Sequence, residues 1–295
     1  MPAHQDTIFQ QFLAPLFGNI LIDRKSMEQL RQSINWEAES TRLTNPRLTY
    51  PDYYQSQNFH GIERGYLNSE AAVSYDAVTQ HVLPPSEAIV RQGIIERVQV
   101  QPQRILDLGC GTGSTTVILK QAFPEAEVIG LDLSPYMLAA AQAKAANLEI
   151  KFCHGMAEQT GFPDRSFDLV SASLLFHETP PEISQKIIQE SFRLLRVGGE
   201  MIVLDGNQQT LRQTQWLTEI FEEPYIKAYA AASMDGWMSK AGFGQVRTEQ
   251  WWWVHQISQG VKPILKNTST SVKAETQVRY NNPKFNNTGG IPAPA

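Results

Sequence analysis

The pattern of apolar and polar residues changes near residue 104, and it divides the chain into parts with different predicted structure. Toward the N-terminus, apolar residues recur every four positions from Ile8 to Ile20, which predicts one apolar helical stripe. Pro15 and Gly18 interrupt the stripe, so we expect a kink or two short helices. We expect the stripe to pack against the rest of the protein, with a partner contact or a membrane-surface helix as alternatives.

The segment that follows combines a predicted helix with an aromatic-rich stretch. Ser26 and Gln29 fit a capping box, which predicts a helix that begins there and runs to about Arg42. From Tyr50 to Tyr75, tyrosines and phenylalanines are crowded without a clean period. Aromatic side chains with a polar tip suit a lid over a ligand, and they equally suit an irregular packed cover.

From residue 104 onward, short apolar runs alternate with helical patterns. Strands are predicted at 104–109, 127–134, 148–155, 166–176 and 200–206, and helices at 114–123, 134–146 and 180–199. Ser134 and Pro135 provide the N-cap and the first turn of the second helix, and Gly198 and Gly199 close the third. Strands that alternate with helices in this way form right-handed parallel βαβ units.

The C-terminal part completes the predicted sheet. A helix with a break near Pro224, a second helix and two closing strands are predicted at 208–232, 233–243, 244–250 and 251–258. The last strand opens with three tryptophans, Trp251 to Trp253, which we expect to cover the sheet against helices; a dimer contact or an acceptor wall is the alternative. The residues from Asn267 are rich in Asn, Thr, Ser, Pro and Gly, which is typical of disorder.

Together these elements predict an α/β fold. We expect a doubly wound, Rossmann-like, seven-stranded and mainly parallel sheet with a C-terminal antiparallel strand, preceded by a helical and irregular lid. The corresponding parts are an N-terminal extension at 1–100, a ligand-binding domain at 101–262 and a disordered tail at 263–295. In such a sheet the ligand binds at the carboxyl ends of the strands, here near the first strand.

Composition and charge exclude several classes of protein. The 295 residues are 42% hydrophobic and carry a net charge of −5, whereas nucleic-acid-binding proteins usually carry a basic excess, so we expect no nucleic-acid partner. Two cysteines, Cys110 and Cys153, cannot form a disulfide framework and suit a reducing compartment. Asp6 precedes the apolar segment where a signal peptide would have basic residues, so we do not interpret this segment as a signal peptide. No apolar run approaches the roughly 18 residues of a membrane span, so we expect a cytoplasmic protein without stable membrane insertion.

The run ILDLGCGTGSTT places three glycines at alternate positions, Gly109, Gly111 and Gly113. A phosphate-binding P-loop requires a lysine directly after its last glycine, and the first lysine here is Lys120. A dinucleotide-binding loop places its third glycine one position later, at Ser114. A bound phosphate and a dinucleotide therefore both fit this loop poorly, which favours a ligand without a phosphate.

The loop resembles motif I of the class I S-adenosylmethionine-dependent methyltransferases, which ILDLGCGTG matches at every position. VIGLDLSPYML resembles their second-strand motif, GMAEQTGFPDRSFDLV their adenine-contact loop and fourth strand, and ESFRLLRVGGEMIVLD their shared helix and fifth strand. The resemblance is firm from Arg104 to Asp205 and looser to about Val261. It is strongest to the enzymes of ubiquinone and menaquinone biosynthesis, and it implies S-adenosyl-L-methionine as the cofactor.

The resemblance also implies a set of cofactor-binding residues. The three glycines let the chain pass beneath the ligand, Asp107 would orient its amino group directly or through water, and Asp132 would accept both ribose hydroxyls in a charge-assisted pair. As alternatives, Asp107 would only hold the loop and Asp132 would only cap the next helix. The other expected contacts, with the adenine ring and the amino group, involve Leu133, Met156, Ala157, Glu158 and Ser173.

Within that set, a backbone N–H near Ala157 would contact the adenine ring and Met156 would pack against it, unless Met156 is an ordinary core residue. For catalysis, methyl transfer is an in-line displacement, so the protein must align the reacting atoms and exclude water. His177 follows the fourth strand and is a candidate acceptor contact or base, with a loop hydrogen bond as the alternative. Glu178 is a weaker candidate, and His60 would reach in from the lid.

The leading hypothesis is therefore a methyltransferase that uses in-line displacement on a small-molecule acceptor of quinol, phenolic or lipid-like type. An NAD-dependent oxidoreductase on the same layout is one alternative, and a non-catalytic cofactor-binding or scaffold protein is another. Under the leading hypothesis the lid, residues 50–66, is needed for turnover more than for cofactor binding. We expect no metal site, because the histidines lack the spacing of metal ligands, and we expect a monomer or a homodimer.

Overall fold

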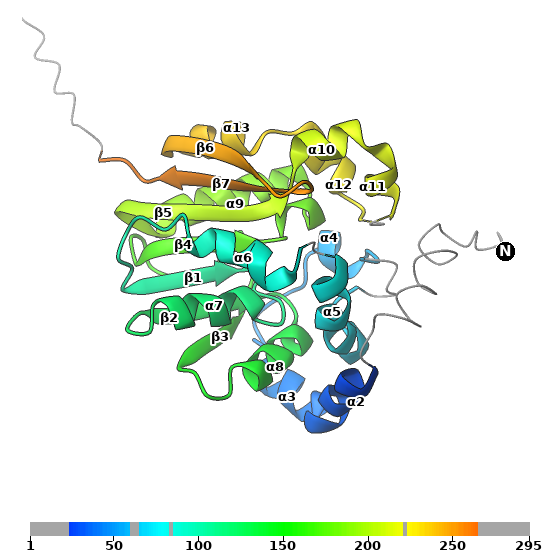
Figure 1. Cartoon of the computed structure of the whole chain (residues 1–295). Coiled ribbons are helices and arrows are strands. Elements are labelled where there is room, and N and C mark those ends of the chain that lie inside the picture. The colour runs from blue at the N-terminus through cyan, green and yellow to red at the C-terminus, as the bar shows by residue number, and fades with distance from the viewer. Residues whose placement is uncertain (1–23, 60–64, 83–84, 221–222, 265–295) are drawn as a thin grey trace, which may run out of the picture. The chain divides into compact units, whose positions relative to one another are not determined.

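In a computed structural model of the chain (Figure 1), the structure describes residues 24–59, 65–82, 85–220 and 223–264. The predicted apolar stripe near the N-terminus, His60 and the predicted tail from residue 265 lie outside these residues. None of the helices within the described ranges is both long enough and apolar enough to cross a bilayer.

A seven-stranded sheet forms the centre of the fold, in the order β3-β2-β1-β4-β5-β7-β6. The strands are β1 (Arg104–Leu108), β2 (Glu127–Asp132), β3 (Ile150–His154), β4 (Phe167–Ser173), β5 (Leu195–Gly206), β6 (Gly244–Trp251) and β7 (His255–Val261). Neighbouring strands among β1 to β5 pair in parallel, whereas β7 is antiparallel to both β5 and β6. The predicted fold class is confirmed, and the strand order reverses at β1, which lies between β2 and β4.

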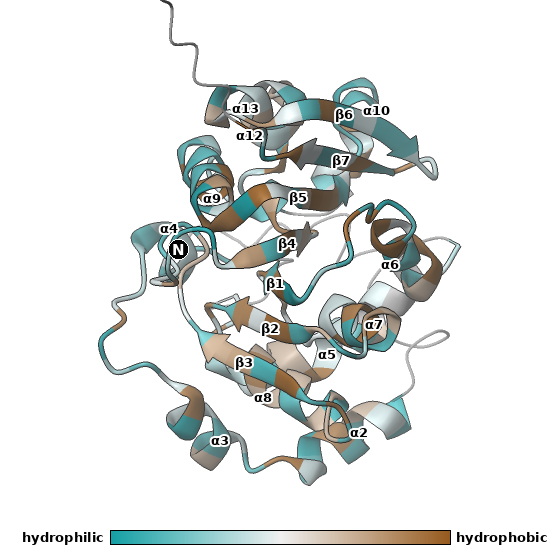
Figure 2. Cartoon of the chain, turned by 90° about the vertical axis from the view of Figure 1, so that its left-hand side faces the viewer, coloured by the Kyte–Doolittle hydropathy of each residue, from teal (hydrophilic) through white to brown (hydrophobic). Residues whose placement is uncertain are grey.

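Helices cover both faces of the sheet (Figure 2). On one face, α6 (Glu87–Ile95) and α7 (Ser114–Ala122) pack with a buried cluster that includes Ile105 and Leu204. On the other face, α9 (Pro181–Leu194) and α13 (Met234–Ala241) pack with the larger core cluster. Each large apolar side chain buried in these clusters stabilises the fold by about 1.5–3 kcal/mol, so the two clusters hold the strands rigidly beneath the site.

The start of two helices follows directly from their sequences. Ser134 caps α8 (Pro135–Lys144): its side chain accepts a hydrogen bond from the backbone of Met137, and Pro135 occupies the first turn, as predicted. Gly113 begins α7 with φ +80°, and a Cβ there would lie 3.0 Å from the Cβ of Ala141 in α8. A glycine is therefore needed where the loop turns into α7.

The helix predicted from Ser26 to Arg42 is wrong in detail, because two helices occupy this stretch. They are α2 (Arg24–Ser33) and α3 (Trp36–Leu43). Asn35 between them has a non-helical conformation, and its side chain accepts a hydrogen bond from the backbone N–H of Ala38. An asparagine cap therefore starts a new helix within the stretch that the capping box of Ser26 and Gln29 predicted as a single helix.

The predicted end of the helix at 180–199 is also wrong. Helix α9 ends at Leu194, and Leu195 already pairs with Phe167 as the first residue of β5. The Nζ of Lys262 donates hydrogen bonds to the carbonyls of Phe192 and Leu195, at 2.6 and 2.9 Å. A distant lysine thus satisfies the carbonyl groups that a longer helix would have used.

The C-terminal helices and tryptophans agree with the prediction in part. The break at Pro224 is confirmed, but a second break at Thr214 yields α10 (Gln208–Gln213), α11 (Gln215–Ile220) and α12 (Ile226–Ala231). Trp251 donates a hydrogen bond to the carbonyl of Val90 in α6, so it covers the sheet as expected. Trp252 and Trp253 are 45% and 57% exposed, and for them the expectation is wrong because the chain turns at Trp252, where φ is +54°.

The N-terminal part packs across the carboxyl ends of the strands. It contributes α4 (Asp52–Gln55) and α5 (Ser69–Val82), and α3 and α5 both contact α8. Phe59 and Tyr66 are buried in a small cluster with Met137 of α8. We refer to its aromatic residues near the strand ends as the aromatic cover, which consists of Tyr53, Tyr54, Phe59, Tyr66 and Tyr75.

Candidate active site

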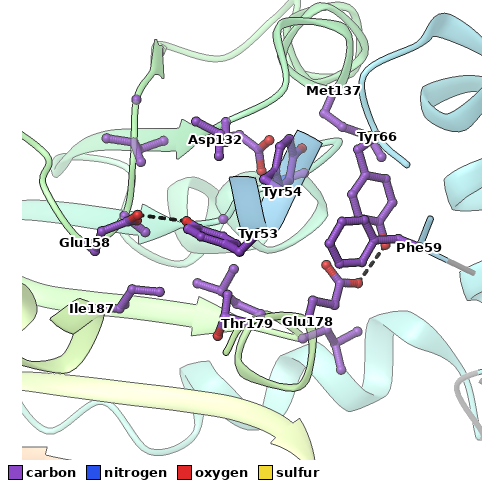
Figure 3. A pocket seen from close by; sticks show the side chains of 18 of the residues that line it. Tyr53, Tyr54, Phe59, Tyr66, Asp132, Met137, Glu158, Glu178, Thr179 and Ile187 are labelled. Carbon is purple, nitrogen blue, oxygen red and sulfur yellow. Dashed lines mark hydrogen bonds between the residues drawn. The ribbon is translucent and has the colours of Figure 1, made fainter. Parts of the chain in front are cut away.

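A cavity lies between the aromatic cover and the carboxyl ends of β1, β2 and β4 (Figure 3). This is the place where the strand order reverses, and open α/β sheets bind their ligands at such a point. All five residues of the cover line it. Six of the sequence-predicted cofactor residues line it as well, namely Gly109, Gly111, Asp132, Leu133, Ala157 and Glu158.

Asp132 is the buried carboxylate of this cavity. It ends β2, and its Oδ1 and Oδ2 accept hydrogen bonds of 2.8 Å from the backbone N–H groups of Ser134 and Gly111. Burial raises the pKa of Asp132 to about 6, although these hydrogen bonds oppose the shift. Each carboxylate oxygen can accept more than one hydrogen bond, so Asp132 can hold a ligand hydroxyl while it stays fixed by the backbone.

The glycine loop passes close beneath the cavity. Gly109 has φ +61° and Gly111 has φ +54°, a backbone conformation that favours glycine. A Cβ on Gly109 would lie 2.7 Å from a methyl carbon of Leu175. The loop therefore brings bare backbone to the cavity wall, as the sequence predicted for a ligand that lies directly on the chain.

Asp107 lies behind this loop. It is fully buried, and it accepts hydrogen bonds from the hydroxyls of Thr116 at 2.7 Å and Ser171 at 2.8 Å. Burial raises its pKa to about 6. Asp107 is not among the residues that line the cavity, so any contact with a ligand would run through water or through the loop it supports.

Three further predicted cofactor residues, Gly113, Met156 and Ser173, do not line the cavity either. The hydroxyl of Ser173 lies 2.7 Å from the hydroxyl of Thr115 and 2.9 Å from Nη1 of Arg91. Arg91 is 4% exposed and also pairs with Glu87, at 2.8 Å. This network joins α6 to α7 and to the end of β4, and the spacing of Glu87 and Arg91 was its one sequence signal.

His177 forms a buried pair with an aspartate that the sequence analysis missed. It lies in a short 3-10 helix, η3 (Phe176–Glu178), and its Nδ1 is 2.6 Å from Oδ1 of Asp205. Asp205 is fully buried at the end of β5 and also accepts the backbone N–H groups of Phe176 and Gly206. The sequence feature that could have identified Asp205 is an acidic residue near the end of the predicted strand at 200–206.

The pair determines the charge of His177. Burial alone lowers the pKa of His177, but the charge and hydrogen bond of Asp205 outweigh it and raise the pKa to about 9. The imidazole is therefore protonated at neutral pH, and a protonated imidazole donates hydrogen bonds and does not accept a proton. His177 does not line the cavity, whereas its neighbours Glu178 and Thr179 do.

Two tyrosines of the aromatic cover are hydrogen-bonded to carboxylates in the cavity wall, as Figure 3 shows. The hydroxyl of Tyr53 donates to Oε1 of Glu158 at 2.8 Å, and that of Tyr66 donates to Oε1 of Glu178 at 2.7 Å. Burial, reinforced by the carboxylates, raises the pKa of both phenols, so they remain donors. These bonds fasten the cover to both sides of the cavity.

The chemistry of the wall suits a cationic nucleoside. Asp132, Glu158 and Glu178 are its carboxylates, and none of the described residues that line the cavity is Lys, Arg or His. Carboxylates and aromatic faces both attract a positively charged group such as a sulfonium or an ammonium. Across the described ranges, His, Cys, Asp and Glu side chains nowhere gather in a group of three that would hold a metal ion.

Comparisons with known proteins agree with this geometry. A family described as "Methyltransferase domain" matches residues 105–199. The demethylmenaquinone methyltransferase of Lactococcus lactis is 30% identical over 192 residues, which cover 62% of this chain and 72% of that enzyme. The demethylmenaquinone methyltransferase of Thermus thermophilus is 35% identical over 140 residues, which cover 46% of this chain and 63% of that enzyme.

A solved structure shows the same fold. Phosphoethanolamine N-methyltransferase 2 of Haemonchus contortus, in complex with S-adenosylhomocysteine, superimposes with a TM-score of 0.53 at 15% identity, covering 75% of this chain and 62% of that one. The chain belongs to the class I S-adenosylmethionine-dependent methyltransferases. Within that family it resembles the enzymes that methylate quinones, although it spans less than two thirds of the Thermus thermophilus enzyme.

Proposed function

We propose that the protein transfers the methyl group of S-adenosylmethionine to a small-molecule acceptor with a quinol or phenolic ring. The observation that carries this proposal is the buried carboxylate of Asp132, which lines a cavity above a glycine loop with positive φ. A ribose offers two adjacent hydroxyls to such a carboxylate, and a charge-assisted pair of hydrogen bonds is strong. The absence of a phosphate-binding lysine from the loop supports a donor without phosphates.

The other predicted residues fit the same donor. In this proposal Leu133, Ala157 and Glu158 surround the adenine ring, because all three line the wall beside Asp132. The amino-acid end of the donor lies over the glycine loop, and Asp107 supports that loop from behind. The carboxylates in the wall attract the positive charge of the sulfonium, and so they favour binding of the donor over the neutral thioether that remains after transfer.

The composition of the cavity also supports an acceptor without negative charge. A phosphate or carboxylate on the acceptor would face Glu178 with no described cation in the lining. An aromatic hydroxyl compound would instead stack on the cover and donate to a carboxylate. The names of the relatives, both demethylmenaquinone methyltransferases, support a quinol in particular.

In this proposal His177 is a positioning residue that does not contact the ligand. Its pairing with Asp205 holds η3, which places Glu178 and Thr179 in the cavity wall. Because His177 is a cation at neutral pH and does not line the cavity, this proposal assigns it no role as a base. The predicted role of His60 stays a prediction.

Ligand binding followed by methyl transfer tests the proposal. A hundredfold excess of S-adenosylhomocysteine over its dissociation constant should stabilise the protein by about 2.7 kcal/mol, and NAD should have no effect. Incubation with a labelled methyl donor and a reduced naphthoquinone should then label the quinol. The variant Asp132→Asn should lose at least tenfold in affinity, whereas Asp164→Asn, at an exposed surface pair with Arg193, should not. Stabilisation by NAD alone would contradict the proposal.

A further inference from the structure

Glu178 is the cavity carboxylate that the proposed function does not assign to the donor. The carboxylates of the described lining are Asp132, Glu158 and Glu178, and none of the described lining residues is Lys, Arg or His. In the proposed function the ribose lies on Asp132 and the adenine ring lies beside Glu158. Figure 3 shows Glu178 on the side of the cavity opposite Glu158. Glu178 therefore faces the part of the cavity that is left for the acceptor.

The place of Glu178 in the fold also brings it to the reacting end of the donor. Leu175, which directly precedes η3, packs on the glycine loop, because a Cβ on Gly109 would lie 2.7 Å from its methyl carbon. In the proposed function the amino-acid end of the donor lies over this loop, so the sulfonium lies between the loop and Asp132. Burial raises the pKa of Asp132, and the charge of Glu178 adds to the shift. The two carboxylates therefore interact across the same end of the cavity.

Contacts on both sides orient the carboxylate of Glu178. Its Oε1 accepts the hydroxyl of Tyr66 at 2.7 Å, and Nε2 of His177 lies 3.9 Å from the same oxygen. The second distance is too long for a hydrogen bond, but a cation there still attracts the carboxylate. A carboxylate can accept about four hydrogen bonds, so the bond from Tyr66 leaves capacity for a ligand hydroxyl. The other titratable groups around these contacts are Tyr54, Tyr75, Asp132 and Glu223.

We propose that Glu178 is the base of the reaction and takes the proton of the acceptor hydroxyl. The proposal rests on the proposed function, because it takes the acceptor to be a quinol or a phenol. The O–H bond of the acceptor breaks and its proton moves to Glu178, while the electron pair that stays on the acceptor forms the bond to the methyl carbon. The C–S bond breaks with its electron pair on sulfur, which becomes an uncharged thioether, and Glu178 then releases the proton to water.

The same base serves an acceptor that is methylated on carbon. Ionisation of the hydroxyl makes the neighbouring ring carbon electron-rich, and that carbon then forms the bond to the methyl group. The carbon afterwards loses its hydrogen to water as a proton, and the oxygen regains a proton from Glu178. One proton leaves the acceptor in total, as in methylation on oxygen.

The substitution Glu178→Gln tests this step through the pH dependence of turnover. Its amide oxygen can still accept from Tyr66, but an amide does not take up a proton. With S-adenosylmethionine and a reduced naphthoquinone, the kcat of the wild type should change less than about threefold between pH 7 and 8.5. This range lies between the pKa of Asp132, about 6, and that of His177, about 9. The variant should lose about a hundredfold in kcat at pH 7 and regain almost tenfold per pH unit, because it depends on acceptor that is already ionised.

Tyr66→Phe is the matched control, because it removes the same hydrogen bond and leaves the carboxylate in place. Its kcat should keep the pH dependence of the wild type even where its magnitude is lower. The dissociation constant of the uncharged S-adenosylhomocysteine should change less than about threefold in Glu178→Gln, because the ribose site on Asp132 is intact. A reduced chloronaphthoquinone, whose hydroxyls are more acidic, should recover about tenfold of the loss in Glu178→Gln relative to the wild type.

The outcomes separate this proposal from the proposed function. If Glu178→Gln keeps the pH dependence of the wild type and gains nothing from the more acidic acceptor, Glu178 is not the base and the proposed function stands. The same holds if Tyr66→Phe acquires the steep dependence, because the loosened cover is then the cause. If the wild type labels no quinol, the proposed function itself fails. Should Glu178→Gln not fold, the wild type decides: a kcat that rises about tenfold per pH unit would overturn the proposal, and a flat profile would support it.

Discussion

At the scale of single residues, two aspartates near the cavity differ in their surroundings, although burial raises the pKa of both. The pKa of Asp107 and that of Asp132 are both raised to about 6. Asp107 accepts hydrogen bonds from the hydroxyls of Thr116 and Ser171 and lies behind the loop, whereas Asp132 is held by backbone N–H groups and lines the cavity. Only the second arrangement leaves a buried carboxylate available to a ligand.

The raised pKa of Asp132 predicts a pH-dependent affinity. The ionised carboxylate accepts both ribose hydroxyls, so binding of S-adenosylhomocysteine should be at full strength above about pH 7. As the pH falls through about 6, the carboxyl becomes protonated and the affinity should drop, by up to tenfold per pH unit. Calorimetry between pH 5 and 8 measures this slope. Asp132→Asn should bind weakly and without the slope, and a slope that persists in this variant would contradict the assignment.

At the scale of elements, β6 carries a local backbone strain. Gln245 has φ +51°, and the pairing of β6 with β7 is irregular between Gly244 and Arg247. A left-handed conformation costs a residue with a Cβ about 1–2 kcal/mol, and glycine avoids this cost. Gln250 in the same strand is also exposed, but it pairs regularly with Gln256.

This contrast predicts opposite effects of the same substitution. Gln250→Gly should lower the free energy of unfolding by about 1 kcal/mol, because glycine in a regular strand loses more conformational entropy. Gln245→Gly should leave it unchanged or raise it by up to about 1 kcal/mol, because relief of the strain offsets that loss. Urea unfolding of both variants measures the difference. Equal destabilisation would show that the irregular pairing carries no strain.

At the scale of the whole molecule, the N-terminal part closes the site that the sheet builds. The cavity encloses about 70 Å³, whereas sites for small molecules usually measure about 300–1,000 Å³. In the proposed function a nucleoside can therefore enter only when the aromatic cover moves aside. The hydrogen bonds from Tyr53 to Glu158 and from Tyr66 to Glu178 hold it in the closed position.

Loosening the cover should impair turnover more than donor binding. Tyr66→Phe removes the hydrogen bond to Glu178, so water would enter more readily while the glycine loop and Asp132 remain intact. We expect a fall in kcat of at least tenfold with the dissociation constant for S-adenosylhomocysteine changed less than threefold. The control is Tyr50→Phe, whose hydroxyl lies 3.4 Å from His154 and outside the cavity lining. An equal loss of binding and turnover would overturn this role of the cover.

The sequence by itself determined the order of the strands and of the helices between β1 and β5, the glycine loop and the carboxylate at the end of β2. These features are local: apolar runs, caps and turn residues act over a few positions, so their pattern can be read along the chain. Its errors include two helix boundaries: Asn35 caps a new helix within the stretch predicted as one helix, and α9 ends at Leu194, where the distant Lys262 bonds its carbonyls.

Only the tertiary structure decided which polar groups meet. Tyr53 and Glu158 are 105 residues apart, Tyr66 and Glu178 are 112 apart, and Arg91 and Ser173 are 82 apart. Each pair depends on how the N-terminal part packs across the sheet, which no local period encodes. Burial then gives these contacts their strength, because a hydrogen bond to a carboxylate matters most where water is excluded.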